Sequence, residues 1–241
     1  MRRLVKGGQG ALHMRDEILA ALLSANKDLS RDEPEVAVNI GLQLEHMGLF
    51  TWSISVRRRI RDAVSRIEPK NIILTGAGIG HLSSWLFDHF EQVEGIENFQ
   101  MIEEGNRFAV ILKRLSQRYS SVPSSIVVGS PLLLCSELKA WSISKAGDSP
   151  ILASADAIIV DAPMTKLASD IKAMLPILNP DGVLFTVEPT PPVGDRTEDD
   201  PEVVGFNNWM DLIRTSNETH HLAFAPLFGG TIVAWLPKDQ D

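Results

Sequence analysis

Residues 71–81 read NIILTGAGIGH, and this stretch decides the fold. A short apolar run is followed by three glycines at alternate positions, Gly76, Gly78 and Gly80. An apolar run of this length suits a buried parallel strand. Glycine lets the backbone adopt unusual dihedral angles and lie close to a ligand. The stretch therefore predicts a strand, a glycine-rich turn and the beginning of a helix.

The spacing of the glycines separates this loop from the dinucleotide-binding fingerprint. That fingerprint, G-x-G-x-x-G, would place its third glycine at position 81, where this chain has His81. The spacing is instead G-x-G-x-G, and with no pyrophosphate to bind, the loop can hold a nucleoside that carries an amino-acid tail. The alternative is a tight strand–helix turn that binds no ligand.

Strand-like and helix-like patterns alternate on both sides of the loop. The expected strands are 71–75, 93–97, 125–128, 157–160, 183–187, 221–227 and 231–236, and the expected helices between them are 82–90, 101–115, 132–141, 167–178 and 206–215. Such alternation implies an α/β fold with a mostly parallel sheet covered by helices on both faces. The run Phe228-Gly229-Gly230 joins the last two strands and is a hairpin signal.

The chain ahead of the first strand reads as helical. Residues 14–26 and 36–47 have apolar residues at helical spacing, and Ser53 is a candidate cap for the helix that follows. We therefore expect a helical N-terminal extension over 1–54 and a ligand-binding domain over 55–241. The extension is expected to pack over the ligand end of the sheet or to form a homodimer contact.

Charge and cysteine content limit the class of protein. The net charge of −8 argues against a protein that coats nucleic acid. Residues 1–70 are slightly basic, with 12 Lys/Arg against 9 Asp/Glu, whereas the remainder has 11 against 22. The single cysteine, Cys135, cannot form an intrachain disulfide, and no apolar run is long enough to cross a membrane. The cytoplasm is the expected location.

Four arginines crowd the helix that follows Ser53. They are Arg57, Arg58, Arg59 and Arg61. An RNA-binding role would require aromatic partners and a wider basic surface. A solvated helix face or a subunit contact is the preferred interpretation.

Three acidic residues fall at the ends of expected strands. Glu97 would end the second strand, where a carboxylate can accept hydrogen bonds from both ribose hydroxyls. Asp161 and Glu188 would end the fourth and fifth strands, outside which ligands of open α/β sheets bind. Asp161 is the better candidate for positioning a substrate or removing its proton. The alternatives are a helix cap for Asp161 and a solvated strand end for Glu188.

Residues 72–86, 93–98, 155–163 and 178–182 together resemble the class I (Rossmann-like) superfamily of S-adenosylmethionine (SAM)-dependent methyltransferases, nearest its catechol O-methyltransferase-like branch. The resemblance implies a seven-stranded, mostly parallel sheet with a terminal antiparallel hairpin, and SAM as the cofactor. It also implies these cofactor-binding residues: Gly76, Ala77, Gly78, Ile79 and Gly80 in the loop, Glu97 on the ribose, Asn98, Gly129 and Ser130 near the adenine, and Asp161 beside the methyl group.

The sequence departs from the family pattern at several positions. Leu74 and Ser130 stand where the family usually has acids. Metal-dependent relatives need several converging oxygen ligands, of which only Asp161 and Glu188 are present, so no metal is expected. The implied function is methyl transfer to a small molecule, with Asp161 and Glu188 as catalytic candidates. The alternatives are methylation of RNA or protein, and a non-catalytic relative that binds partners.

Overall fold

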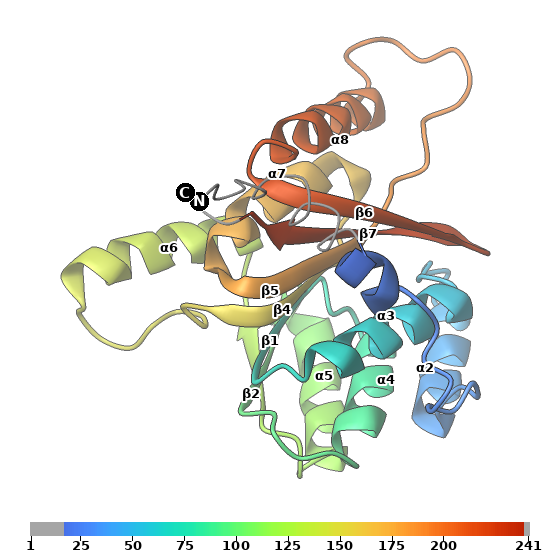
Figure 1. The fold of residues 1–241 in the computed structure, drawn as a ribbon, viewed down its shortest axis with the longest axis vertical. Helices are drawn as coiled ribbons and strands as arrows, with labels where there is room; N and C mark the ends of the chain where they lie inside the picture. The colour runs from blue at the N-terminus through green and yellow to red at the C-terminus, as the bar shows by residue number, and fades with distance from the viewer. Residues whose placement is uncertain (1–16, 239–241) are drawn as a thin grey trace, which may run out of the picture.

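A seven-stranded sheet forms the centre of the computed structural model, which describes residues 17–238 (Figure 1). The strands are β1 (Asn71–Thr75), β2 (Asn98–Glu103), β3 (Ser124–Val128), β4 (Ala155–Val160), β5 (Leu178–Val187), β6 (His220–Leu227) and β7 (Gly230–Pro237). Their order across the sheet is β3-β2-β1-β4-β5-β7-β6. The first five strands are parallel, whereas β7 pairs antiparallel with both β5 and β6. The expected α/β fold with a closing antiparallel hairpin is confirmed.

The strand order reverses direction at β1. The chain runs outward from β1 to β2 and β3, and then returns to place β4 on the other side of β1. In open α/β sheets such a reversal opens a crevice at the carboxyl ends of the two central strands. The residues that follow β1 and β4 are therefore the first place to look for a site.

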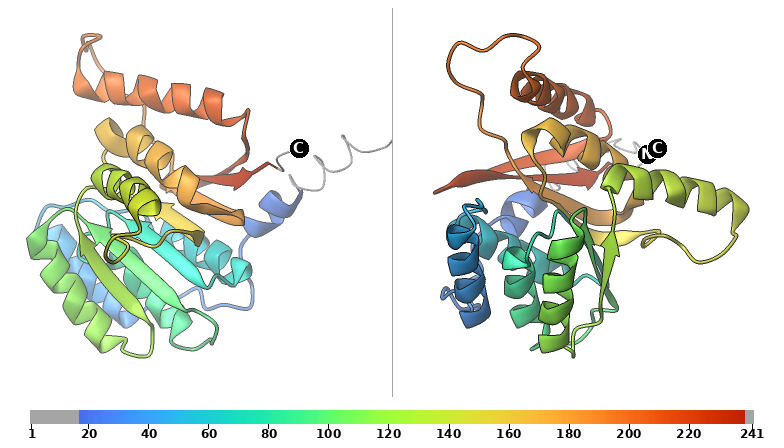
Figure 2. Two further views of the ribbon diagram at one scale, coloured as in Figure 1. Left: turned by 90° about the vertical axis from the view of Figure 1, so that its left-hand side faces the viewer. Right: turned by 180° about the vertical axis from the view of Figure 1, so that it is seen from behind.

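Two layers of helices cover the sheet, and each layer has its own hydrophobic core (Figure 2). The helices are α2 (Glu35–His46), α3 (Ile54–Ile67), α4 (His81–Phe90), α5 (Asn106–Arg118), α6 (Pro131–Ser144), α7 (Met164–Met174) and α8 (Pro201–Ser216). Helices α2 to α5 pack on one face, and α6 to α8 pack on the other. Within residues 17–238, no helix combines the length and the apolar character needed to span a membrane.

The N-terminal extension packs on the layer that contains α3 and α4. Residues 17–22 are helical, and Leu19, Leu22, Ile40 and Leu44 are buried in the same core as the apolar face of α3. The expected cap of α3 is confirmed, because the Ser53 hydroxyl accepts a hydrogen bond from the Val56 N–H at 3.3 Å. Residues 14–16 of the first expected helix lie outside the described residues. The domain boundary at residue 54 stays a prediction.

The expected second strand, 93–97, is wrong. These residues belong to the loop after α4, in which Val93 is exposed and Gly95 has a φ of 118°. The strand that pairs with β1 begins at Asn98, and the helix after it begins at Asn106 instead of residue 101. A strand sandwiched between two helix layers needs apolar side chains on both faces. The buried Phe99, Met101 and Ile102 meet this need, and residues 93–97 do not.

Candidate active site

The glycine loop lies against the end of β4. Gly76, Gly78 and Gly80 have φ values of 67°, 57° and 93°, in the left-handed region that favours glycine. A Cβ atom added to Gly76 would lie 1.7 Å from the backbone oxygen of Asp161, so this contact admits no side chain. A Cβ atom added to Gly78 would meet no atom within 4 Å. The loop is therefore tightly packed at its first glycine and open at its second.

Glu103 holds the loop from the neighbouring strand. This buried residue ends β2, and its Oε2 atom accepts a hydrogen bond from the Gly78 N–H at 2.8 Å. Its Oε1 atom accepts a second hydrogen bond from the Gly105 N–H at 2.9 Å. Two backbone donors thus fix the carboxylate at the carboxyl edge of the sheet, beside the glycine loop.

A cavity of about 470 Å³ opens above the glycine loop and Glu103, and we call it the main cavity because it lies at the carboxyl ends of the central strands. Its walls combine the carboxyl ends of β1, β2 and β4 with residues 49–52 ahead of α3. The apolar part of the lining includes Leu49, Trp52, Leu82 and Phe108. This volume falls within the usual range for sites that take small ligands.

Asp161 lies where the main cavity meets a smaller side cavity of about 160 Å³. It follows β4, and its N–H donates to the Thr75 oxygen at 3.1 Å. Burial raises the pKa of Asp161 to about 7, and the nearby charge of Glu103 contributes. Both the protonated and the ionised carboxyl are therefore populated near neutral pH, as a group that exchanges protons requires.

The side cavity contains a second unusual acid, Asp170 of α7. Asp170 is only 5% exposed, and its carboxylate accepts no hydrogen bond from a described residue. Burial and, to a smaller extent, the charge of Glu104 raise its pKa to about 6, against the opposing charge of Lys166. An ion pair of 2.7 Å joins Lys166 to Glu104, which both line the same cavity. A ligand that donates a hydrogen bond would complement Asp170.

We expect Asp170→Asn to raise the melting temperature at pH 8. The folded-state pKa, about 6, exceeds the usual unfolded value of about 3.9, so ionisation of Asp170 costs stability at high pH. This cost, up to about 2 kcal/mol, is relieved as the pH falls from 6 toward 4. Thermal unfolding at pH 8 and pH 4.5 should show a gain at pH 8 that shrinks at pH 4.5. The exposed Asp181→Asn is the control, and an unchanged or lower melting temperature of Asp170→Asn at pH 8 would contradict the argument.

A cluster of polar side chains includes two residues that line the main cavity, Arg57 and His81. Glu33, which precedes α2, forms an ion pair of 2.6 Å with Arg57 and also accepts from the ring nitrogens of His81 and Trp85, each at 3.3 Å. Burial and the charge of Arg57 lower the pKa of His81 to about 4, so its ring is neutral. The Nε atom of Arg57 and the Nδ1 atom of His81 are buried without a hydrogen-bond partner in the described chain. Arg57 and His81 both line the cavity, so they can serve a polar ligand group.

Glu97 and Asn98 lie away from this site, which corrects the prediction that they bind the ribose and the adenine. They lie at the amino-terminal end of β2, where Glu97 forms an exposed ion pair of 3.0 Å with Lys70. Asn98 donates from its side chain to that of Asn71. The error follows from the misplaced strand, because the carboxyl end of β2 is six residues further along the chain at Glu103.

The other predicted residues divide into two groups. The loop residues and Asp161 line the main cavity, apart from Gly80, which is the N-terminal cap of α4. Glu188 is exposed after β5 and lines neither cavity. Gly129 donates its N–H to the Glu103 oxygen at 3.1 Å, and Ser130 precedes α6. Their roles at the adenine stay predictions. The described residues contain no group of three or more His, Cys, Asp or Glu side chains suited to a metal ion.

Three residues of the site, Glu103, Arg57 and Asp170, were not predicted from the sequence. Glu103 had a usable signal, since it directly follows residues 99–102, of which all but Gln100 are apolar. Arg57 had none, because its neighbours in sequence are also arginines and only packing separates the buried Arg57 from the half-buried Arg58 and Arg59. Asp170 had none either, because it lies within an amphipathic helix where a solvated acid is the ordinary expectation.

Several solved structures share this fold. An O-methyltransferase from Bacillus cereus in complex with SAH is 16% identical, with a TM-score of 0.64 over 92% of this chain and 97% of that one. The O-methyltransferase TomG from Streptomyces achromogenes, solved with SAM, is 16% identical, with a TM-score of 0.65 over 95% and 99%. The SAH-bound Podospora anserina methyltransferase PaMTH1 is 12% identical, with a TM-score of 0.58 over 99% and 100%. No protein-family model matches the sequence, and no curated protein sequence is significantly similar to it. At these identities the likeness establishes a common fold.

Proposed function

We propose that this chain is a SAM-dependent methyltransferase that acts on a hydroxyl group of a small molecule. The observation that carries the proposal is Glu103, a buried carboxylate held between Gly78 and Gly105 at the edge of the main cavity. The solved O-methyltransferases with the same fold, two of them in complex with SAM or SAH, support it. Because one fold can serve many functions, the residues of the site carry the proposal, and the common fold only adds to it.

The residues present fit SAM. Gly78, at which an added Cβ meets no atom, leaves room for the cofactor above the loop. Glu103 would accept hydrogen bonds from the ribose hydroxyls, as a carboxylate at this strand end does in nucleotide sites. The base would then enter the side cavity, where Asp170 can accept from its amino group. The methionine end would extend toward Arg57 and His81, which also line the main cavity.

Bound SAM supplies an electrophilic methyl group on a cationic sulfonium, and the chain positions the acceptor. Asp161 is at the junction of the two cavities, where it can orient an acceptor hydroxyl and take its proton. Trp52 and Phe108 give the cavity apolar walls, which limit the water around the reacting groups. Transfer by in-line displacement depends mainly on such alignment. The walls favour an aromatic or otherwise apolar acceptor that carries a hydroxyl group.

The location and assembly of the chain belong to the same proposal. Cys135 is buried, and burial raises the pKa of its thiol to about 11, which keeps it unreactive. A protein without disulfides suits the reducing cytoplasm. A homodimer contact through the extension stays a prediction.

Asp161→Asn should lower the methylation rate by roughly 100-fold and leave SAH binding within about threefold, because the base contributes in the transition state. In the unaltered chain the rate should rise with pH through about 7, as Asp161 ionises, and this rise should disappear in the variant. The assay measures transfer of radiolabelled methyl from SAM to a panel of catechols, phenols and hydroxylated aromatic acids.

Glu188→Gln is the matched control, because Glu188 lines neither cavity, and its rate should be unchanged. If SAH binds but no member of the panel is methylated, the acceptor class is wrong. If SAH does not bind at millimolar concentration, the proposed cofactor is wrong, and the chain is better regarded as a partner-binding relative.

A further inference from the structure

A separate hollow of about 480 Å³ lies beside α3 and shares no lining residue with the main cavity. Four of its lining side chains are cationic: Lys27, Arg31, Arg58 and Arg59. They come from the loop before α2 and from the second turn of α3, so a folded surface brings them together. The chain as a whole has a net charge of −8, which makes this local excess of positive charge unusual.

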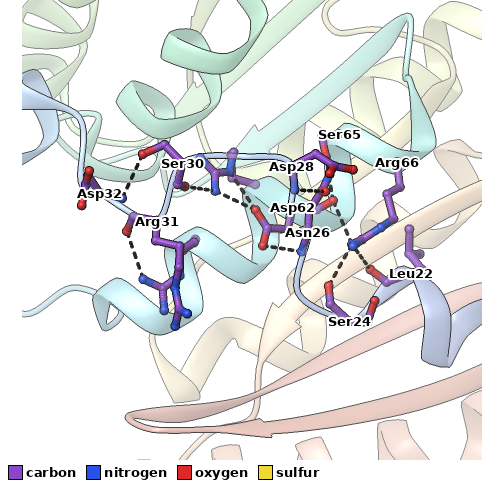
Figure 3. Close-up of polar contacts among 12 residues, drawn as sticks. Leu22, Ser24, Asn26, Asp28, Ser30, Arg31, Asp32, Asp62, Ser65 and Arg66 are labelled. Atoms are coloured by element: carbon purple, nitrogen blue, oxygen red, sulfur yellow. Dashed lines mark hydrogen bonds and ion pairs between the residues drawn. The ribbon is translucent and has the colours of Figure 1, made fainter.

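The acid that lines the hollow, Asp62, is already engaged. Its Oδ1 atom accepts from two nitrogens of Arg61, at 2.9 and 2.7 Å. Its Oδ2 atom accepts from the Asn26 N–H at 2.9 Å. Figure 3 shows Asp62 with the loop folded around it. Arg61 is thus the ion-pair partner of Asp62, and this one carboxylate also faces the charge of Arg59, so it balances only part of the positive charge of the hollow.

Neutral carbonyl groups hold two of the guanidinium groups in place. Arg58 donates to the Arg31 oxygen at 3.1 Å, and Arg59 donates to the Leu23 oxygen at 2.6 Å. Hydrogen bonds of this kind fix the arginines but leave their positive charges uncompensated. In the described chain none of the four cations forms an ion pair, and the side chains of Lys27 and Arg31 donate no hydrogen bond. Arg58 and Arg59 therefore have a structural role, since they hold the loop before α2 in place. Lys27 and Arg31 have no such role among the described residues.

The charges also act on one another. The pKa of Arg59 is lowered, first by burial; the charge of Asp62 opposes this, and the charges of Arg58 and Arg66 add smaller lowering contributions. Like charges held close together destabilise the empty site, and a bound anion would remove that cost. The site is thus built to gain from an anion.

An exposed aromatic ring completes the rim. Phe228, at the turn between β6 and β7, lines the hollow and is 90% exposed. The Ser53 hydroxyl donates to the Phe228 oxygen at 2.9 Å, which fixes the turn beside α3. A ring of this exposure has no packing role of its own, and it presents a flat apolar face next to the cations. The combination of cations with a free aromatic face is typical of sites that bind nucleotide units.

We propose that this cationic hollow binds the phosphate groups of a nucleotide, free or as a unit of single-stranded RNA, with the base stacked on Phe228. Guanidinium groups match phosphate oxygens in geometry and charge. The volume of the hollow suits a ligand of nucleotide size. The site is separate from the proposed methyltransferase site and does not depend on SAM.

The test uses three probes with the purified full-length chain in low salt: inorganic triphosphate, uridine triphosphate and a fluorescein-labelled oligouridylate of eight nucleotides. Uridine probes avoid competition for an adenosine site. At least one uridine probe should bind, and affinity should fall steeply with added salt. Lys27→Ala/Arg31→Ala should weaken binding at least about tenfold, because each substitution removes a cation that contacts a phosphate group. The salt dependence of binding should fall as well. Neither side chain braces the fold, so the variant should unfold at the same temperature as the unaltered chain.

The matched control is Lys113→Ala/Arg114→Ala, which removes the same charge from exposed positions of α5. It should bind like the unaltered chain. Phe228→Ala should weaken the uridine probes and spare inorganic triphosphate, since only the base uses the ring. Binding of uridine triphosphate alone supports a free nucleotide, and binding of the oligouridylate supports RNA. No binding of any probe at low salt, or an equal loss in both double variants, would overturn the proposal.

Discussion

A Glu103→Ala variant should bind S-adenosylhomocysteine at least about 100-fold more weakly than the unaltered chain. Removal of this carboxylate deletes the acceptor for two ribose hydroxyls, and each charge-assisted hydrogen bond contributes about 1.5–3 kcal/mol. It also removes the acceptor of the hydrogen bonds that the Gly78 and Gly105 N–H groups donate to Glu103, at 2.8 and 2.9 Å. The glycine loop then loses the contact that fixes it. Isothermal titration of both proteins with S-adenosylhomocysteine measures the effect.

Glu97→Ala is the matched control, since it removes an acid of the same type that lies at the opposite end of β2. Its affinity should equal that of the unaltered chain. Glu103→Gln keeps an oxygen acceptor and should fall between the two. Equal affinities of Glu103→Ala and the unaltered chain would remove the central observation from the proposed function.

Gly76→Ala should destabilise the fold by roughly 4 kcal/mol, and should lower the melting temperature by about 10 °C or more. The added Cβ would lie 1.7 Å from the Asp161 oxygen, and this atom belongs to the backbone, so no side-chain rotation can relieve the clash. The ends of β1 and β4 would have to separate. The φ of 67° adds a smaller cost for any residue other than glycine.

Gly78→Ala separates these two causes. Its φ of 57° carries the same backbone cost, but its Cβ would meet no atom within 4 Å. We expect a loss of only about 1 kcal/mol, measured by the same thermal unfolding experiment. Similar melting temperatures for the two variants would show that the contact between the loop and β4 is looser than it is in this structure.

The fold was predictable because its signals are local and repeated. The sequence has three such signals: the run 71–75, the three glycines, and the alternation of strand and helix patterns. All three predict the same α/β fold with a mostly parallel sheet. Boundaries were less predictable. The loop 91–97 contains Val93 and Ile96, enough apolar character to imitate a strand, and only the packing of Phe99 and Met101 between the helix layers decides the matter.

The site was predictable only where it coincides with strand ends. Gly76 and Asp161 follow β1 and β4 directly, so their meeting could be expected from the topology. Glu103 was missed because the boundary of β2 was misplaced. Arg57 and Asp170 reach the cavities from helices, and whether a charged helical residue is buried depends on contacts that are distant in sequence.

The central sheet divides the interior into two hydrophobic compartments, and the main cavity draws its helical lining from one of them. Its wall residues come from α2 to α5, the loops beside them and the strand ends, whereas α6 and α8 contribute none. Residues that share no contacts affect stability almost independently. The compartment of Trp209 and Trp235 can therefore change in sequence, or be strengthened, without reshaping the main cavity, provided that Lys166 and Asp170 of α7 keep their places in the side cavity. Substitutions that change the acceptor preference and substitutions that change the stability of the fold can then accumulate in different layers. The helices that line the main cavity can therefore vary while the other layer maintains stability.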